Sequence, residues 1–387
     1  YDEKSRLLKA ISPTGLAQRF EWDPEDNLLL HTDAAGRKTR FEYTGVNELA
    51  RRINPDGTTV QYHYNTEEQL IAVTNERGQT YRFAYDAVGH VSARTDYWGH
   101  THRYIHDPAG QLIKSIDPLE QAIAFTYDPA GRLTAKQFES EEQETFTWDP
   151  AGNLIAFESP DARVERLFDP DGRMILETSS GFEVACEYDG SGLRTVRTTS
   201  HGNRIAYTHD ANGQVSAITI NEQPPVEIER NSVGQITSEK FSEQLSRTYR
   251  YDGEGRLTCQ QITSPLHCIE RTFQYDAAGN RTAKTDSSKG NRQFTYDPMD
   301  RITESIDPMD QVKQYNHDPA GDLLNHLSEP QKGLRTATRK NRTYRFEAAG
   351  NLAEREQPKG LTRFTWDQQN RLCAQIVESY HFRFLNG

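Results

Sequence analysis

A short motif recurs along almost the whole chain, at a step of 21 residues in most places, and this period constrains the fold more than any other feature. We count 18 copies from the residue before each turn, usually a Tyr or Trp, and call that residue the anchor. A fixed step of this size is typical of repeat proteins, in which neighbouring units stack into one structure. The anchors are Tyr1, Trp22, Tyr43, Tyr64, Tyr85, His106, Tyr127, Trp148, Phe168, Tyr188, His209, Arg230, Tyr251, Tyr275, Tyr296, His317, Phe346 and Trp366.

The copy at residues 125–133 shows what one unit can form. Phe125 and Tyr127 alternate with polar residues, which is the period of a half-buried strand. Asp128-Pro129-Ala130-Gly131 has the residue preferences of a type I turn, and its Gly can adopt the left-handed conformation that closes a hairpin. Leu133 then begins the return strand, so each copy is predicted to be a β-hairpin. Matching turn residues in other copies are Asp149 and Gly152, Asp252 and Gly255, and Asp276 and Gly279.

The return strand carries a second regularity. The sixth residue after the anchor is aliphatic or Met in 16 of 18 copies, and only Arg194 and Arg281 differ. A further turn falls midway in each unit, for example at residues 33–36, 54–57 and 75–78. Each copy should therefore hold two strands and two turns, with the anchor and the sixth residue in one layer. The fold class predicted is all-β: tandem hairpins in one long antiparallel sheet, with no helix longer than two turns.

The array is predicted to run continuously over residues 1–387, as about 18 repeats of about 21 residues. It is looser at 148–231 and carries an insertion at 328–341, and both ends look like cuts within a longer array. The acidic segment 139–144 is expected to face solvent. The insertion region holds the one basic cluster, which is either a solvated loop or a contact for an acidic partner: Lys332, Arg335, Arg339, Lys340 and Arg342.

Composition excludes several classes of protein. The net charge is −12 and no basic stripe is visible, which argues against a nucleic-acid binder. No apolar run reaches the length of a membrane helix, and no signal-peptide pattern is present. Hydrophobic content is only 34%, yet the 38 aromatic residues lie at strand spacing, which favours a folded sheet over disorder.

Residues that could carry chemistry are few. His100, His102 and His106 form the best metal candidate, but His106 stands at an anchor and is better explained as a packed ring, so no metal or cofactor is predicted. The turn aspartates recur in nearly every copy, which indicates turn capping and no catalytic role. No enzyme motif is present. Cys259 and Cys268 could form a disulfide, although free thiols are favoured for all four cysteines.

The repeated Tyr-Asp-x-x-Gly-Arg-Leu, at residues 127–133 and 251–257, resembles the YD repeat of the Rhs family. Variants at 148–154 and 275–281 fit the same pattern. The family includes bacterial Rhs toxins, the C components of Tc toxin complexes and the animal teneurins. The resemblance implies a sheet wound as a spiral shell that, in bacterial members, encloses a C-terminal toxin domain. It also implies a bacterial protein made in the cytoplasm and delivered outside the cell.

Several partners follow from the resemblance alone. They are the toxin cargo, the remaining shell of the same polypeptide, type VI spike proteins (VgrG and PAAR) or a Tc B component, and an immunity protein. The family's self-cleavage core is not identifiable here: Asp-Pro-Ala-Gly occurs at Asp107, Asp128, Asp149 and Asp318, each time followed by ordinary repeat sequence. The expected role is therefore that of the wall only, with no catalytic residues.

A size estimate predicts a partial shell. Two strands per copy at about 4.8 Å each give a sheet roughly 170 Å long, enough for about one turn around a toxin of about 130 residues. Two alternatives to a scaffold remain open from the sequence. One is a binding module whose exposed Tyr, Trp and Arg contact glycans or a cell-surface partner, and the other is an enzyme with a site in the lumen.

Overall fold

The structure, a computed structural model, describes residues 1–323, 336–339, 342–367 and 369–379. These residues form strands, turns and bends without a helix, as the period predicted, and hence no helix there could cross a membrane. The strands follow the sequence copies, two to a copy. The strands of the first sheet are β1 (Lys9–Ile11), β2 (Ala17–Trp22), β3 (Leu28–Thr32), β4 (Lys38–Tyr43), β5 (Leu49–Ile53), β6 (Thr59–Tyr64), β7 (Leu70–Thr74), β8 (Thr80–Tyr85), β9 (Val91–Thr95), β10 (Thr101–His106), β11 (Leu112–Ile116), β12 (Ala122–Tyr127), β13 (Leu133–Phe138), β14 (Gln143–Trp148), β15 (Leu154–Glu158), β16 (Arg163–Phe168), β17 (Met174–Ser179), β18 (Phe182–Tyr188), β19 (Arg194–Thr199), β20 (Arg204–His209), β21 (Val215–Ile220), β22 (Val226–Arg230), β23 (Ile236–Ser242), β24 (Leu245–Tyr251), β25 (Leu257–Thr263), β26 (Cys268–Tyr275), β27 (Arg281–Asp286), β28 (Gly290–Tyr296), β29 (Ile302–Ile306) and β30 (Val312–Gln314).

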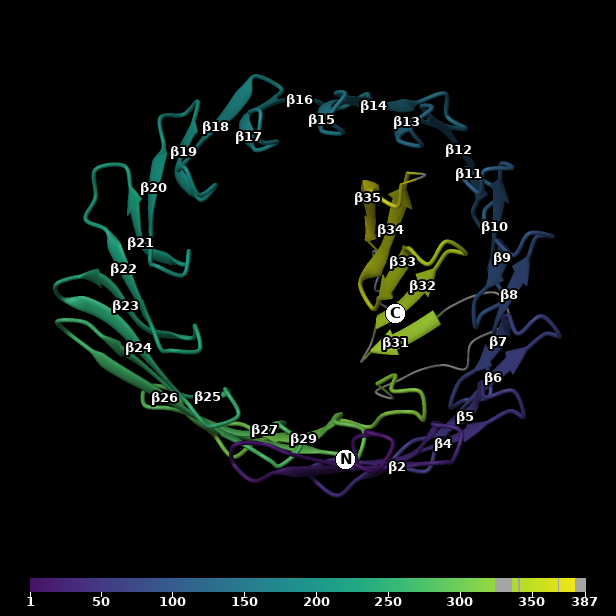
Figure 1. The fold of residues 1–387 in the computed structure, drawn as a ribbon, viewed down its shortest axis with the longest axis horizontal. Coiled ribbons are helices and arrows are strands. Elements are labelled where there is room, and N and C mark those ends of the chain that lie inside the picture. The colour runs from purple at the N-terminus through teal and green to yellow at the C-terminus, as the bar shows by residue number, and fades with distance from the viewer. Residues whose placement is uncertain (324–335, 340–341, 368, 380–387) are drawn as a thin grey trace, which may run out of the picture.

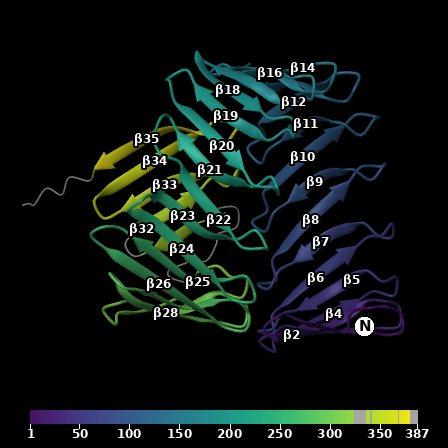
Figure 2. The same cartoon turned by 60° about the vertical axis from the view of Figure 1, so that its left-hand side comes forward.

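These 30 strands form one antiparallel meander in which each strand pairs with its neighbour in sequence. The ribbon curls into a ring, and its first strands pass beside β27 and β29 near the end of the turn (Figure 1). Seen from another side, successive hairpins climb along the ring, so the ribbon is a spiral and does not close on itself (Figure 2). The prediction of a long antiparallel sheet wound as a partial shell is confirmed.

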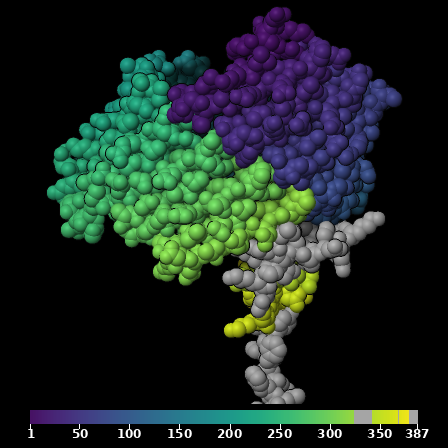
Figure 3. Space-filling model, turned by 90° about the horizontal axis from the view of Figure 1, so that it is seen from below, coloured from purple at the N-terminus to yellow at the C-terminus, as the bar shows by residue number. Residues whose placement is uncertain are grey.

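A second antiparallel sheet holds the last five strands: β31 (Thr336–Arg339), β32 (Arg342–Phe346), β33 (Leu352–Gln357), β34 (Gly360–Trp366) and β35 (Leu372–Ser379). It lies within the outline of the ring in Figure 1 and projects beyond one end of it in Figure 3. The guanidinium of Arg371, before β35, is 3.8 Å from the carboxylate of Asp161 in the β15–β16 turn. The second sheet therefore reaches toward the wall opposite the point where the first sheet ends.

The turn at residues 128–131 shows why each copy makes a hairpin. The N–H of Asp128 donates to the carbonyl of Arg132 at 2.9 Å, and the N–H of Gly131 donates back to Asp128 at 2.9 Å. Gly131 has φ of 80°, a conformation that costs a residue with a Cβ about 1–2 kcal/mol. The pairing shifts at Thr126 and Tyr127, which is the bulge expected beside such a turn.

The wall is one sheet thick, and this limits burial. Among the described residues, the buried apolar side chains are few: Leu30, Val60, Ala72, Ala135, Phe138, Val184, Cys186, Val196, Cys259 and Leu361. Tyr127 lies opposite Leu133 across the strand pair, so both face one side as predicted, but both are only half-buried. A residue in a single sheet is covered by its neighbours along the ribbon and by no second layer.

Two exceptions to the pattern have a local explanation. The guanidinium of Arg194 lies 5.1 Å from the ring centre of Tyr207, and that of Arg281 lies 5.3 Å from the ring centre of Phe294. At these copies an arginine therefore covers the neighbouring aromatic ring where other copies use an aliphatic side chain, a cation–π arrangement.

The acidic segment 139–144 was expected to face solvent, and this expectation was wrong for its last residue. Glu144 is buried, and its carboxylate accepts from Lys136 Nζ at 3.0 Å. Strand β14 begins at Gln143, and Glu144 lies directly opposite Lys136 in the sheet. Strand pairing thus turns the end of the expected loop into a buried ion pair.

Candidate functional site: the seam that closes the ring

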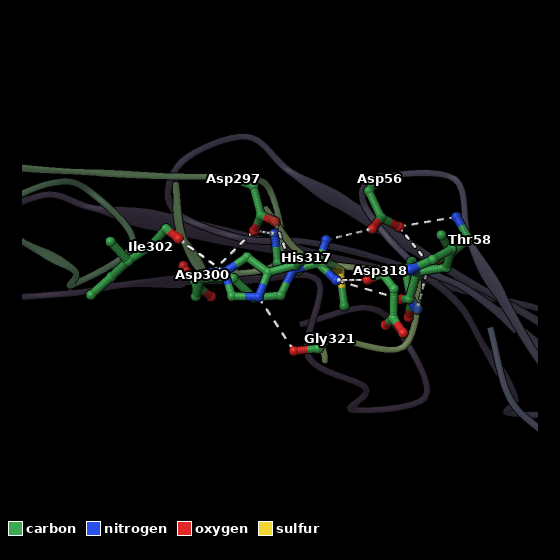
Figure 4. Close-up of polar contacts among 12 residues, drawn as sticks. Asp56, Thr58, Asp297, Asp300, Ile302, His317, Asp318 and Gly321 are labelled. Carbon is green, nitrogen blue, oxygen red and sulfur yellow. Dashed lines mark hydrogen bonds and ion pairs between the residues drawn. The ribbon is translucent and has the colours of Figure 1, made fainter. Parts of the chain in front are cut away.

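The first and last parts of the spiral touch along a row of polar contacts, which we call the seam. The seam joins mid-copy turns of the first repeats to anchor turns about one full revolution later. Figure 4 shows its central part, with Asp56 from the first repeats facing the turns that contain Asp297, Asp300 and Asp318. Its members are Ser12, Thr14, Arg37, Asp56 and Arg77 on one side, and Gly253, Glu254, Asp300, Arg301, Asp318 and Asp322 on the other.

The contact between Arg37 and Asp300 is bidentate. Arg37 Nη1 donates to Asp300 Oδ1 at 2.6 Å and Nη2 donates to Oδ2 at 3.2 Å, while Nε is held by Asp33 at 2.6 Å. Burial opposes ionisation of Asp300, but hydrogen bonds from Arg37 and Asn280 outweigh it and hold the pKa of its carboxyl below the usual value. Asp33, in the same β-turn, therefore fixes the orientation of the Arg37 side chain, which contacts the next revolution of the spiral.

In the next contact the charges are exchanged, with the aspartate in the first repeats and the arginine one revolution later. Arg301 Nη2 lies 3.3 Å from Asp56 Oδ2, and its Nε donates to Asp297 at 2.6 Å. Asp56 Oδ1 accepts from the N–H and hydroxyl of Thr58, at 3.0 and 2.6 Å. His317 takes the place of a Tyr anchor beside this pair, with Nε2 2.9 Å from the carbonyl oxygen of Ile302 (Figure 4).

Arg77 makes the most buried contact of the seam. Its Nη1 is 2.9 Å from Oδ2 of Asp318, whose side chain is only 8% exposed, and its Nη2 bonds Asp322. Asp318 Oδ1 accepts a hydrogen bond from the N–H of Asp322 at 3.0 Å. Because Asp318 is shielded from water, its charge depends on Arg77 for compensation.

The fourth contact joins Thr14 to the turn that contains Gly253 and Glu254. The N–H of Thr14 donates to Glu254 Oε1 at 3.3 Å, and its hydroxyl bonds the same oxygen. Hydrogen bonds from Ser12 and then Thr14 lower the pKa of Glu254. A Cβ at Gly253 would lie 2.8 Å from Thr14 Cγ2, so a larger residue there would require the Thr14 side chain to move.

The order of charges along the seam sets its register. Arg37, Asp56 and Arg77 on one side meet Asp300, Arg301 and Asp318 on the other, so positive and negative partners alternate. A slip by one copy would bring Asp56 to Asp322 in one direction, or Arg77 to Arg301 in the other, and like charges in contact are unfavourable. The hydrogen-bonded partners are 240 to 263 residues apart, and one revolution therefore takes roughly 12 copies.

The predicted anchors join one copy to the copy before it. Seven anchor rings donate from the hydroxyl or indole N–H to a backbone carbonyl 14 to 18 residues earlier, at 2.8 to 2.9 Å: Tyr85, Tyr127, Trp148, Tyr251, Tyr275, Tyr296 and Trp366. This bond satisfies a polar group on a half-buried ring and ties hairpins together along the ribbon.

The predicted turn aspartates cap their own turns. Asp128, Asp149, Asp252 and Asp276 all accept the N–H of the residue four positions later at 2.8 to 2.9 Å. The N–H and the guanidinium of Arg132 hold the pKa of Asp128 below its usual value. Side-chain hydrogen bonds from Ser288 and Arg271 likewise lower the pKa of buried Asp286.

These shifts predict acid sensitivity. A carboxyl whose folded pKa lies below its unfolded value, near 3.9, stabilises the fold above that pH and ceases to do so as pH falls through the folded value. The urea midpoint, followed by fluorescence of the four tryptophans, should change little between about pH 7 and 5 and fall below about pH 4. A midpoint that rises in acid would contradict this. Asp128→Asn should make the fall of the urea midpoint in acid smaller than in the wild type.

The three histidines of the sequence-derived metal candidate are not brought together. His100 Nδ1 lies 3.1 Å from Asp96, and His106 Nδ1 lies 4.0 Å from Asp86. His102 is on the same strand as His106, and burial lowers the pKa of its imidazole. Strand β10 therefore places His100 and His106 at opposite ends of the hairpin.

The cysteines and the basic cluster can also be placed in part. Cys186 and Cys259 are buried and Cys268 and Cys373 are exposed, all as free thiols, so Cys259 and Cys268 are not bridged. The strand register puts Cys268 opposite Thr263, four residues from Cys259. Of the basic cluster, Lys332, Arg335 and Lys340 lie outside the described residues.

The seam itself was missed by sequence reasoning. Arg37 and Arg77 follow ordinary mid-copy turns, and Asp300 occupies a turn position that is Gly in 12 of the 18 copies. The five other non-glycine residues at this position are Ser5, Asp26, Asn47, Glu68 and Asn370, and they share its positive φ, so the backbone conformation of Asp300 does not mark it as a seam residue.

Comparisons with known proteins agree with this fold. The Teneurin YD-shell model matches residues 111–261 and 224–383, and the RHS Repeat model matches residues 22–59 and 64–98. The structure is similar to that of TcdB2-TccC3 without its hypervariable C-terminal region, with a TM-score of 0.69 at 15% identity over 97% of this chain. It is also similar to the Photorhabdus luminescens Tc holotoxin pore, with a TM-score of 0.62 at 14% identity over 96% of this chain.

This chain spans only part of the proteins that it matches. It covers 22% of the TcdB2-TccC3 chain and 26% of the holotoxin chain. A curated relative, double-stranded DNA deaminase toxin A of Burkholderia cenocepacia (strain H111), is 30% identical over 110 residues, which are 27% of this chain and 8% of that protein. Since the YD-shell model alone matches well over half of its residues, the chain belongs to the Teneurin YD-shell family.

Proposed function

We propose that this chain is a wall segment of a shell that encloses a toxin polypeptide, within one continuous array of repeats. The observation that carries the proposal is the seam, which joins successive turns of the spiral edge to edge. A hydrogen-bonded ribbon that also adheres to its own next turn forms a wall without an open gap at that joint. A protease or a target molecule would then be excluded from the lumen.

The dimensions of the ring support a cargo that is not a compact domain. Strands β2 to β24, 23 in number, lie between the partners of the Thr14–Glu254 contact. At about 4.8 Å per strand the circumference is about 110 Å, which leaves a free radius of about 12 Å inside the side chains. A folded domain of 100 residues has a radius of gyration of about 13 Å. The enclosed chain would therefore be extended along the axis or incompletely folded.

The named relatives support the same role. Two structural neighbours are Tc toxin assemblies, and the curated relative is named as a toxin. By likeness, we propose a bacterial protein that is exported, with a downstream toxin, the rest of the shell and an immunity protein as partners. A Tc B component is the partner that the TcdB2-TccC3 likeness favours, and type VI spike proteins are the other candidate for delivery.

We propose no enzymatic activity for the wall. The turn carboxylates are engaged in capping and ion pairs, as Asp128 and Asp252 illustrate. The adhesion alternative relied on free aromatic and arginine side chains, but Tyr127 and Trp148 are half-buried and bonded to the preceding copy. Adhesion therefore has less support than encapsulation.

Limited proteolysis of the complete polypeptide that carries this chain tests the proposal. The seam variant Arg37→Ala/Arg77→Ala should expose downstream cargo and raise its cleavage rate by at least about tenfold, since protection then depends on local opening. Arg103→Ala is the matched control, because Arg103 makes only an exposed contact with Glu120 away from the seam. Equal cleavage in the wild type and the seam variant would refute encapsulation by this wall.

A further inference from the structure

One step of the repeat departs from the rest in its side-chain stacking. In three copies, the arginine five residues after an anchor lies over the ring of the next anchor. Arg132 lies 5.9 Å from the centre of Trp148, and Arg256 lies 4.9 Å from the centre of Tyr275. Between β8 and β10 both members are histidines, and the rings of His90 and His106 lie with centres 4.9 Å apart and planes tilted by 35°.

A carboxylate is fixed beside these two rings. Asp86 Oδ1 accepts the N–H groups of Val88 and His90 at 3.0 and 2.9 Å, as a turn aspartate does in other copies. Its Oδ2 is 3.3 Å from His90 Nδ1 and 4.0 Å from His106 Nδ1. In the copy of Tyr127 the corresponding oxygen accepts from Arg132 Nε at 2.7 Å. Two imidazole nitrogens thus stand where six of the 18 copies place the guanidinium of an arginine five residues after the anchor.

The Nδ1 atom of His106 is buried and has no hydrogen-bond partner in the structure. Buried polar atoms without a partner are rare and call for an explanation, such as an ion. Among the described residues, Asp86, His90 and His106 are the one group of three whose ligand atoms lie close enough together to hold a metal, within 4.8 Å of one another.

We propose that Asp86, His90 and His106 bind a zinc ion through one carboxylate oxygen and two imidazole nitrogens. Tetrahedral zinc with bonds of about 2.0–2.1 Å separates its ligand atoms by about 3.4 Å. The Asp86–His90 contact of 3.3 Å already has this spacing, and since all the ligand atoms lie within 4.8 Å of one another, His106 needs to move by at most about 1.5 Å. The side chains of Asp86 and His90 are about one-third exposed, which leaves a fourth position for water.

The site would link two neighbouring hairpins. Asp86 and His90 belong to the β8–β9 turn, and His106 ends β10. The turn backbone that holds Asp86 Oδ1 orients the carboxylate before the ion arrives, which is how outer contacts tune metal ligands. Imidazole and carboxylate together suit zinc better than calcium or magnesium, which take oxygen ligands.

The test is zinc binding to the whole chain after chelator treatment, measured in competition with a chromogenic zinc chelator. Cobalt(II) in place of zinc provides a visible spectrum that reports tetrahedral coordination. His106→Tyr introduces the residue found at half of the anchors, and His90→Gln installs the residue that the copies of Tyr64 and His106 have there. Both should fold, and each should weaken binding at this site by at least about tenfold.

His100→Gln is the matched control. Asp96 and His100 have the same spacing as Asp86 and His90 and a similar contact of 3.1 Å, but lack a third ligand among the described residues. This variant should bind zinc as the wild type does. The proposal is overturned if the wild type takes up no zinc, if His106→Tyr binds as tightly as the wild type, or if His100→Gln loses as much affinity.

Discussion

Replacing Arg77 with methionine should open the seam at a cost of about 3 kcal/mol, because it leaves Asp318 buried without a counter-charge. Methionine keeps much of the stem volume, so the loss reports the charge. Backbone hydrogen exchange should accelerate at residues 75–78 and 318–322, and little elsewhere on the ring. The readout separates seam opening from general unfolding.

The second replacement Asp318→Asn in the same chain should recover part of this loss, since a neutral amide is less costly to bury. Arg103→Met, on the exposed Arg103–Glu120 pair, should change the free energy of unfolding by less than about 1 kcal/mol. If Arg77→Met exchanged no faster than Arg103→Met at the seam turns, the seam would not hold the ring together.

Tyr127→Ala should lower the free energy of unfolding by about 3 kcal/mol, the lower end for loss of a large packed aromatic, since the ring is half-buried. Tyr127→Phe keeps the ring and removes only the bond from its hydroxyl to the carbonyl of Leu112, so its cost should be about 1 kcal/mol. Urea unfolding followed by tryptophan fluorescence measures both.

Asp128→Ala serves as the comparison within the same turn and should cost less than Tyr127→Ala, because it removes capping bonds from a partly exposed carboxylate. The reverse order would show that turn capping, and not the packing of anchors, holds the ribbon together.

The sequence predicted the local structure well because the same short-range physics acts in every copy. Alternation around Tyr127 and the turn at residues 128–131 define a hairpin without knowledge of any other copy. The antiparallel meander then follows, since each hairpin edge needs a partner and the nearest is the next copy. Nothing non-local is required until the ribbon returns to its start.

The contacts that sequence reasoning could not find are those between copies far apart. Arg37 and Asp300 are separated by 263 residues, and their meeting depends on the small curvature added by each hairpin. His90 and His106 are close in sequence, but the contact between their rings depends on how one copy packs against the next. Burial was also overestimated, because a period reveals which residues share a face and not whether a second layer covers that face.

The seam has a consequence for how such an array can change in length. In an open solenoid one unit can be added or lost with only local effects, because each unit touches its neighbours alone. Here a unit inserted anywhere between Arg77 and Asp300 would displace all later partners together, separate Arg37 from Asp300, and bring Arg301 to the place of Asp322 beside Arg77. All the seam contacts together therefore determine the number of units per revolution. Single-unit insertions should be excluded even at positions where point substitutions and loop extensions are tolerated.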